Sequence, residues 1–370
     1  MAVISPARRS TVISDWSTLS PYGIGGEAFT EGVRAGRTVV PRLNSEEWQA
    51  PSDQVCLVPG FDVVEALGSR GTRSMDRLTG ITVATLGSLL EPFGSRKPLS
   101  AAPERVGLVL GTGSGSVQST MDFTRDSLTG AKPFYVDPAR FPNTVMNRAA
   151  GQSAIWYGFK GPNATLAGGP LTGLQALRYA TRLRERGHCE AVLCGAVEEF
   201  SVQRAWLDWH TSEPADRGTT PLAEGCAMFL LEDADSAAQQ GRRPRAEILS
   251  ARFAAFHSPE DLRPTLVRCI RNALRNAGVS PTDVRLAAPS DAAGGPAGVE
   301  AEALTEAMDG TETELVRVRD LFGDASAASA ALQIAAVLAV GPTGPGDGGV
   351  ALVTSLDGDG LVACTVLRLL

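Results

Sequence analysis

The stretch Lys160–Gly195, KGPNATLAGGPLTGLQALRYATRLRERGHCEAVLCG, decides the fold. It predicts a short strand at Asn163–Ala167, a tight turn at Gly168 and Gly169, a helix that begins at Pro170, and a second strand at Ala191–Cys194. Apolar residues recur in the helix at steps of three and four, so one face of the helix is expected to be buried. A strand, a turn, a half-buried helix and another strand are the parts of a layered α/β protein.

The predicted helix begins with a proline. Proline suits the first turn of a helix, because its missing N–H costs no hydrogen bond there. Enzymes often place nucleophiles at such a position, since the free N–H groups of a helix start stabilise a thiolate or an oxyanion. Pro170 has no group for this chemistry, so the stretch predicts a nucleophile site without its nucleophile.

The composition is that of a globular protein, with 43% hydrophobic residues among 370. No uncharged apolar run reaches about 18 residues, and the first residues lack a signal-peptide core. We therefore expect a soluble, cytoplasmic protein without a membrane partner. The net charge of −7 argues against a general nucleic-acid binder.

Few residues suit metal or cofactor binding. The six cysteines include no CxxC pair and no nearby histidine cluster, so we expect no metal, no disulfide framework and no cofactor. The glycine-rich run GTGSGS at 111–116 lacks the Lys-Ser/Thr of a phosphate loop, and we interpret it as a turn between a strand and a helix. The histidines are His188, His210 and His257.

Predicted strands and helices alternate along the whole chain. An acidic segment followed by RRPR marks the best internal boundary, at residues 233–245. We therefore predict two halves, 1–236 and 245–370, tightly packed as one unit, and the alternation of the first half repeats in the second. This pattern predicts a layered α/β fold.

A series of segments carries a resemblance to a known family. The segments are TLSPYG (18–23), SMDRLTGITVATLGSLL (74–90), VGLVLGTGSGS (106–116), GQSAIWYGFKGPNATLAGG (151–169), EAVLCGAVEE (190–199), EGCAMFLLEDADSAAQQGRRPRAEIL (224–249), GPAGVEAEAL (295–304) and DLFGDASAASAALQIAAVLAV (320–340). Their order and spacing resemble the β-ketoacyl synthases of the thiolase fold over nearly the whole chain. The resemblance implies a thiolase-like layered αβαβα fold made of two similar βαβαβαββ halves.

The resemblance also implies a site that has lost its chemistry. The family uses a cysteine that takes the acyl chain as a thioester, two histidines that stabilise an enolate, and a lysine that orients the site. Here the cysteine position is Pro170, and the first histidine position is Asp291, followed by Gly294-Gly295-Pro296. The lysine and second histidine positions are Arg319 and Asp324. We therefore expect no condensation by this chain alone.

The gating loop and the histidine count agree with that expectation. The family's glycine-phenylalanine loop, which gates the site, falls on Leu356–Gly360, where the sequence reads LDGDG. None of the three histidines follows residue 257, so a slip in the alignment cannot supply one.

A ketosynthase-like chain without its nucleophile resembles a chain length factor, the inactive subunit of the heterodimeric ketosynthase in type II polyketide synthases. Members of that group carry glutamine at the position of Pro170. Their pattern Phe-x-Phe-Thr-x-x-x-Phe resembles residues 121–128, which implies that Met121, Thr124 and Leu128 line or cap the tunnel for the growing chain. By spacing alone, ordinary core packing fits these three residues equally well.

The resemblance further implies an interface strand. Thiolase-fold dimers pair through this sheet edge, here formed by Asn163, Ala164, Thr165, Leu166 and Ala167. These features predict a non-catalytic subunit that heterodimerises with a catalytic ketosynthase and shapes its acyl tunnel. Its partners would be that subunit and an acyl carrier protein with a phosphopantetheine-bound acyl chain.

Two other functions stay open. One is a stand-alone, carrier-dependent decarboxylase or acyltransferase with a relocated catalytic group, and the other is an acyl-binding scaffold homodimer. A relocated group would be an Asp291–Asp324 carboxylate pair or one of Cys189 and Cys194. Against it, Arg319 is placed to pair with Asp324, and cysteines in apolar strands are usually buried core residues.

Overall fold

The computed structural model describes residues 10–40, 42–93, 102–291, 298–341 and 348–370. Five strands of the first half form one side of a large mixed sheet. In spatial order they are β1 (Thr11–Ser20), β8 (Gly225–Asp233), β6 (Ala191–Glu198), β4 (Val106–Gly111) and β5 (Asn163–Leu166). The first two neighbouring pairs are antiparallel and the last two are parallel.

The second half repeats this arrangement. Its strands are β9 (Ala246–Ala255), β13 (Leu361–Leu369), β12 (Val350–Leu356), β10 (Val284–Ala288) and β11 (Glu314–Leu315), in that spatial order. The order of antiparallel and parallel neighbours is the same as in the first half. A short contact between β1 and β9 joins the two five-stranded parts. The prediction of two similar halves in one fold is confirmed.

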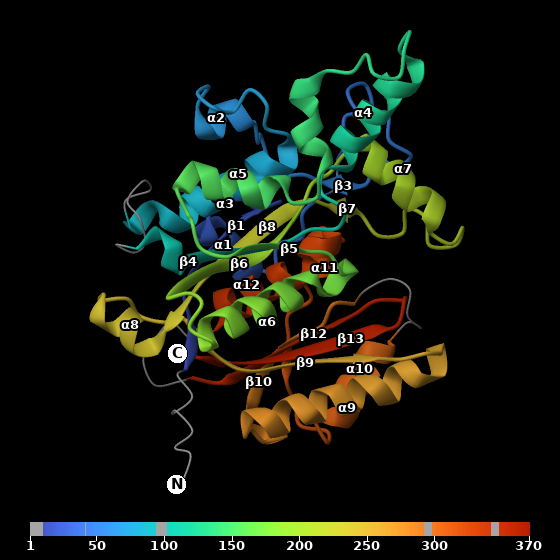
Figure 1. Cartoon of the computed structure of the whole chain (residues 1–370). Helices are drawn as coiled ribbons and strands as arrows, with labels where there is room; N and C mark the ends of the chain where they lie inside the picture. The colour runs from blue at the N-terminus through green and yellow to red at the C-terminus, as the bar shows by residue number, and fades with distance from the viewer. Residues whose placement is uncertain (1–9, 41, 94–101, 292–297, 342–347) are drawn as a thin grey trace.

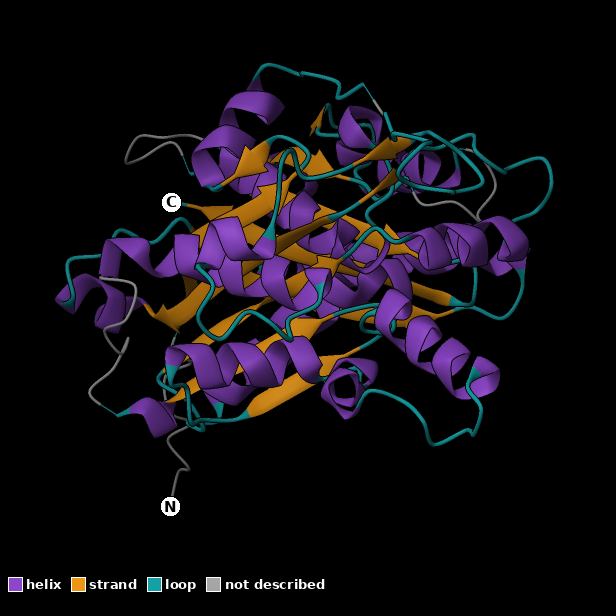
Figure 2. Ribbon diagram, turned by 90° about the horizontal axis from the view of Figure 1, so that it is seen from above, coloured by secondary structure: helices purple, strands orange, loops and turns teal. Residues whose placement is uncertain are grey.

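Helices form three layers around the two sheet halves (Figure 1). The outer layers are α3 (Arg77–Leu90) with α5 (Arg148–Tyr157) on the first half, and α9 (Pro259–Ala277) with α10 (Val299–Ala307) on the second. Between the halves lie α6 (Thr172–Glu185) and α12 (Ser329–Val340). Figure 2 shows the strands flanked by helices from above. The layered αβαβα prediction is therefore confirmed.

The two central helices are in close contact. A Cβ atom at Gly173 of α6 would lie 2.4 Å from the backbone nitrogen of Ala331 in α12, so only glycine permits this approach. Helix α12 is apolar on nearly all sides, as expected for a helix covered by both sheet halves. This packing fixes the N-terminus of α6, where Pro170 lies, against α12.

Smaller elements complete the described chain. They are β2 (Gly23–Ile24), α1 (Gly26–Arg34), β3 (Val55–Cys56), α2 (Val63–Leu67), η1 (Glu91–Phe93), η2 (Pro103–Arg105), α4 (Val117–Thr129), η3 (Pro138–Thr144), η4 (Gly169–Leu171), α7 (Val202–Thr211), β7 (Leu222–Ala223), α8 (Ala234–Gln239), η5 (Pro281–Asp283), α11 (Val318–Phe322) and η6 (Ser326–Ala328). Helix α4 and the 3₁₀ turn η3 stand away from the sheet, as Figure 1 shows. No helix within the described ranges has the length and apolar character needed to cross a membrane.

One predicted segment differs from the structure. The sequence pattern at Glu314–Val318 predicts a strand, but the strand ends at Leu315. Val318 instead begins α11, because it and Phe322 are buried together at a helical spacing of four.

The predicted helix at Pro170 begins slightly later. Pro170 lies in the 3₁₀ turn η4, and α6 begins at Thr172. The predicted boundary at 233–245 falls on α8 and the segment before β9, and the division into 1–236 and 245–370 stays a prediction.

Candidate functional site at the start of helix α6

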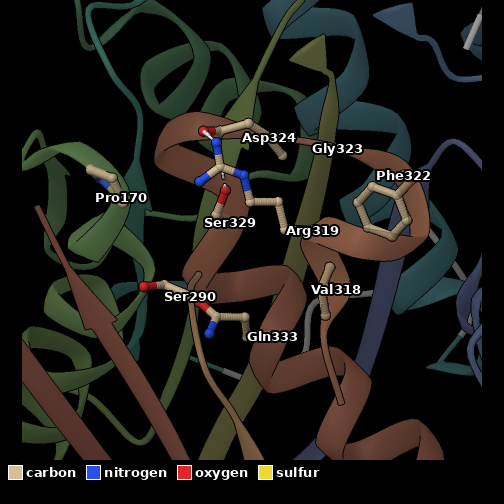
Figure 3. A pocket seen from close by; sticks show the side chains of 10 residues that line it. Pro170, Ser290, Val318, Arg319, Phe322, Gly323, Asp324, Ser329 and Gln333 are labelled. Atoms are coloured by element: carbon tan, nitrogen blue, oxygen red, sulfur yellow. Dashed lines mark hydrogen bonds and ion pairs between the residues drawn. The ribbon is translucent and has the colours of Figure 1, made fainter. Parts of the chain in front are cut away.

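A small cavity of about 10 Å³ lies beside Pro170, which is room for roughly one water molecule. Its lining residues are Pro170, Ser290, Val318, Arg319, Phe322, Gly323, Asp324, Ala325, Ser329 and Gln333. Figure 3 shows Pro170 on one side and the Arg319 guanidinium, directed at Asp324, on the other. The fold therefore brings three of the four predicted positions together in one small space.

The turn before α6 is closed by its own hydrogen bonds. The Thr172 hydroxyl donates to the Gly169 carbonyl oxygen at 2.6 Å and accepts from the Gly168 N–H at 3.0 Å. The backbone N–H of Thr172 also bonds to Gly169. Position 170 itself, as proline, carries no nucleophilic group, and the Thr172 hydroxyl is engaged in closing the turn.

The loop predicted to gate the site lies against the same turn. A Cβ atom built on Gly169 would lie 3.8 Å from Oδ2 of Asp357. The other Asp357 oxygen accepts from the backbone N–H groups of Asp359 and Leu361 at 3.1 and 2.9 Å, which holds the Leu356–Gly360 turn in shape. This loop therefore places a carboxylate beside the Gly169 turn.

Arg319 fills the side of the cavity opposite Pro170. Its guanidinium donates to the backbone carbonyl oxygen of Asp291 and to the Thr220 hydroxyl, the latter at 3.2 Å. It also forms an ion pair with Asp324 at 3.5 Å. The other Asp324 oxygen accepts from the Ser326 N–H at 2.7 Å, so both carboxylate oxygens have partners.

Asp291 is bound from another direction. Its Oδ1 accepts from the Arg317 guanidinium at 2.5 Å, and its backbone N–H donates to Glu300 at 2.8 Å. Asp291 and Asp324 therefore each have an arginine of their own, and the two do not form the bare pair of acids that acid–base catalysis would use. Gly294, Gly295 and Pro296 lie outside the described residues.

Glu300 is a buried carboxylate that sequence reasoning missed. It accepts hydrogen bonds from Ser290 and from the Thr354 hydroxyl at 2.6 Å, and burial raises its pKa. Arg317 was also missed, although it stands two residues before Arg319 in the run VRVRD at 316–320. A second arginine this close to Arg319 was the sequence signal that could have identified Arg317.

Neither cysteine nor histidine supplies a replacement group. Cys189 and Cys194 are both buried, and burial raises the pKa of each thiol, which disfavours the reactive thiolate. His188, His210 and His257 are all exposed, and none lines the cavity. Across the described part of the chain, no cluster of His, Cys, Asp or Glu has the arrangement of a metal site.

The three predicted tunnel residues lie on the surface of the single chain. Met121 is 53% exposed, Leu128 is 79% exposed, and Thr124 is exposed as well. Helix α4 has no buried residue, so ordinary core packing is wrong for these three positions. Tunnel lining stays a prediction, because a partner would have to cover this face.

The predicted interface strand is an open sheet edge. Strand β5 has β4 on one side and no other neighbour among the described strands. The Pro162 carbonyl oxygen accepts from the N–H of Leu108 in β4 at 2.9 Å, and the Leu166 carbonyl oxygen accepts from Thr112, directly after β4, at 3.0 Å. Because backbone groups alternate along a strand, those of Asn163 and Thr165 point away from β4. These groups are free to pair with another chain.

Exposed apolar side chains concentrate in one stretch of the chain. Eight of the seventeen large apolar residues exposed in the described chain lie between residues 121 and 155, on and around α4, η3 and α5. They are Met121, Leu128, Phe134, Tyr135, Phe141, Val145, Met146 and Ile155. Sequence reasoning found two of the eight. An apolar surface of this kind marks an interaction site.

Comparison with known proteins agrees with the fold. The family "Beta-ketoacyl synthase, N-terminal domain" matches residues 9–237. The chain is 29% identical over 316 residues to the "Putative polyketide beta-ketoacyl synthase 2" of Streptomyces halstedii, covering 80% of this chain and 76% of that one.

Two solved structures are also similar. One is described as the ishigamide ketosynthase/chain length factor, with 41% identity, a TM-score of 0.90, and coverage of 98% of this chain and 99% of that one. The other is described as the type II polyketide synthase complex AntDE:AntF; at 17% identity, a TM-score of 0.77 and coverage of 98% and 100%, it shows the shared fold alone. The strand order, the position of Pro170 and these matches together show that the chain belongs to the β-ketoacyl synthase family.

Proposed function

We propose that this chain is the non-catalytic, chain-length-determining subunit of a heterodimeric ketosynthase in a type II polyketide synthase. The proposal rests on the side chains that fill the cavity beside Pro170. Proline stands at the nucleophile position, and Arg319 and Asp324 occupy the space beside it, which leaves about 10 Å³. No acyl chain fits a space of that size, and no thiolate or imidazole lines it.

The open edge of β5 supports a protein partner. Outward backbone groups at Asn163 and Thr165 would pair with a strand of the catalytic subunit and extend the sheet across the two chains. Ile155 of α5 is 75% exposed, and its helix packs beside β5. A partner strand docked at this edge would cover Ile155 and bury its apolar surface.

Helix α4 supports a role in chain length. Met121, Thr124 and Leu128 share one face of the helix at steps of three and four. On another face, Phe123 packs against Phe141 with ring centroids 5.9 Å apart. The exposed face is therefore left for a partner or an acyl chain. A side chain blocking the tunnel end would cost each further extension about 1–3 kcal/mol, a few-fold to over a hundredfold in rate.

The acyl chain would arrive on a carrier protein. The AntDE:AntF structure is described as an acyl-carrier protein in complex with its ketosynthase. For this chain, we place the carrier beside the catalytic subunit, because a protein with a net charge of −7 offers an acidic carrier little attraction. The thioester and the condensation would lie in the partner, and this chain would supply tunnel wall.

Co-expression with an intact Cys-His-His ketosynthase tests the proposal. We expect a 1:1 complex in solution. Thr165→Pro, which removes one outward N–H, should weaken the complex at least tenfold while the chain stays folded. Leu315→Pro on β11, an edge strand of the other half, is the matched control. A stable homodimer that ignores the ketosynthase would favour an acyl-binding scaffold instead, and turnover by the chain alone would favour the stand-alone enzyme.

A further inference from the structure

The N-terminal ends of α3 and α4 and the C-terminal end of β6 lie close together. Ser116 is the N-cap residue of α4, and its hydroxyl accepts a hydrogen bond from the Ser119 N–H at 3.2 Å. Asp76 is the N-cap residue of α3, where its Oδ1 accepts from the Thr79 N–H at 2.8 Å. Glu199 directly follows β6 and is 1% exposed. Helix α4, which carries the predicted tunnel residues, therefore begins beside a buried carboxyl group.

A line of oxygen atoms joins the two acids. Glu199 Oε1 lies 2.8 Å from the Ser116 hydroxyl, Ser116 lies 3.0 Å from the Ser119 hydroxyl, and Ser119 lies 3.5 Å from Asp76 Oδ2. The line has three oxygen–oxygen contacts. Each contact needs one proton, and the two serine hydroxyls supply two. The third proton must belong to a carboxyl group, so the complete line contains one neutral acid.

The surroundings favour the neutral form at Glu199. Its other oxygen, Oε2, accepts from the Leu78 N–H at 2.9 Å, which leaves Oε1 as the atom that carries the proton. Burial first, and the neighbouring Asp76 carboxylate second, raise the pKa of Glu199 to about 8. Burial also raises the pKa of Asp76, although the Thr79 and Ser119 groups oppose that shift.

Arg148 lowers the pKa of Asp76, but no cationic side chain of the described residues pairs with the Glu199 carboxyl group. The charged side chains around the two acids are Glu198, Arg77, Glu224, Arg204, Arg148, Asp122 and Arg140. Arg77 forms a two-point ion pair with Glu224 at 2.5 and 2.8 Å. Arg204 donates to the backbone carbonyl of Glu199, not to its carboxyl group. Protonation of one of the two acids is therefore the remaining way to remove the repulsion between their carboxylates.

Water has access to one end of the line. A cavity of about 230 Å³ lies under α4, and its lining includes Asp76, Ser116 and Ser119. Asp122 and Arg140 lie on the same cavity. Protons can exchange with solvent through this space, so the line is able to respond to pH.

We propose that Glu199 is a positioning residue whose neutral carboxyl group, through Ser116, Ser119 and Asp76, holds the start of α4 against the body of the protein. The inference deepens the proposed function, on which its consequence for chain length rests. Loss of the shared proton leaves two facing carboxylates and breaks the line at one contact. The start of α4 is then released, and the face with Met121, Thr124 and Leu128 moves with it.

Hydrogen exchange of the full chain without a partner tests the positioning role. Glu199→Gln is the decisive variant, because the amide donates to Ser116 and accepts from Leu78 at every pH. Amides in the first turns of α4 are compared with those of α9 in the same molecule, which corrects for the intrinsic pH dependence. Between pH 6 and pH 9 we expect α4 protection in the wild type to fall about tenfold, the change expected one pH unit above the midpoint. The Gln variant should show no such fall.

Identical α4 profiles in the wild type and the Gln variant would overturn the inference. Ser116→Ala provides a second readout, since it should lower α4 protection at both pH values. With an active partner, raising the pH should broaden product length in the wild type only. The exchange experiment needs no partner, so a failed proposal on function and a failed inference on Glu199 give different results.

Discussion

Arg319 and Asp291 are joined across the site, because the Arg319 guanidinium donates a hydrogen bond to the Asp291 backbone carbonyl oxygen. By resemblance these are the lysine and first histidine positions of an active ketosynthase. Here they hold each other, with Arg317 on the Asp291 carboxylate and Asp324 on Arg319. The site has become a structural junction between α11 and the segment after β10.

Restoring the nucleophile alone should not restore condensation. Pro170→Cys places a thiol at a helix start, where we expect iodoacetamide to modify it at least tenfold faster than any native cysteine. Condensation should still be absent, because no histidine lines the cavity and Arg319 fills it. Mass spectrometry after labelling and a carbon dioxide release assay measure the two effects. Pro170→Ala serves as the control for lost proline, and decarboxylation by Pro170→Cys alone would contradict the prediction.

The Arg319 contacts should stabilise the protein. Arg319 is 14% exposed and Asp324 is 27% exposed, so the pair is partly shielded from water. Arg319→Ala leaves the Asp291 carbonyl and the Asp324 carboxylate without this partner, and should lower the free energy of unfolding by about 1–3 kcal/mol. Urea denaturation measures the change.

The matched control is Arg263→Ala on the outer helix α9. Arg263 is 48% exposed and pairs with two exposed glutamates, so its loss should change stability by no more than about 0.5 kcal/mol. Equal effects at the two arginines would mean that the filled site contributes nothing beyond a surface ion pair.

Enlarging the exposed face of α4 should shorten the product. Leu128→Trp or Met121→Trp adds volume to the predicted tunnel wall, and the added ring must be displaced for each further two-carbon unit to enter. Chromatography of products from the reconstituted complex measures the length. Leu315→Trp, at an exposed apolar position on β11, should leave the product unchanged. An unaltered product from both α4 variants would rule out the tunnel assignment.

The native thiols should be unreactive at neutral pH. All six cysteines are buried, and burial raises the pKa of Cys56 and of Cys269 to about 11. Since a thiol reacts as its thiolate, less than about one part in a thousand is reactive at pH 7 even before access is considered. We expect no stoichiometric labelling in the folded protein and six labels after denaturation. Rapid labelling of Cys189 or Cys194 would revive the relocated nucleophile.

The alternation of strands and helices predicts a layered α/β fold, and the family resemblance adds the thiolase-like αβαβα arrangement. The sequence pattern predicts strands at Val284–Ala288 and Leu361–Leu369, and β10 and β13 have these bounds. The apolar repeats of α6 and α12 correspond to real central helices. The secondary-structure prediction is wrong where tertiary packing overrides the local sequence pattern. Alternating VRVR looks like a strand, but burial of Val318 and Phe322 on one side turns its end into α11.

The site was predictable only in part. Pro170, Arg319 and Asp324 were selected by resemblance, and they do line one cavity. Arg317 and Glu300 were not predicted, because residues that meet only in the folded structure have no regular spacing in the sequence. The tunnel residues were undecided from sequence, since one helical face looks the same whether a core or a partner covers it; their exposure on α4 decides against the core.

Reconstitution from purified components tests the central claim most directly. The chain is incubated with malonyl carrier protein, alone and with an intact Cys-His-His ketosynthase, and release of carbon dioxide and acyl products is measured. We expect no turnover by the chain alone, and full-length product only when the ketosynthase is present. Condensation or decarboxylation by the chain without a ketosynthase would contradict this expectation.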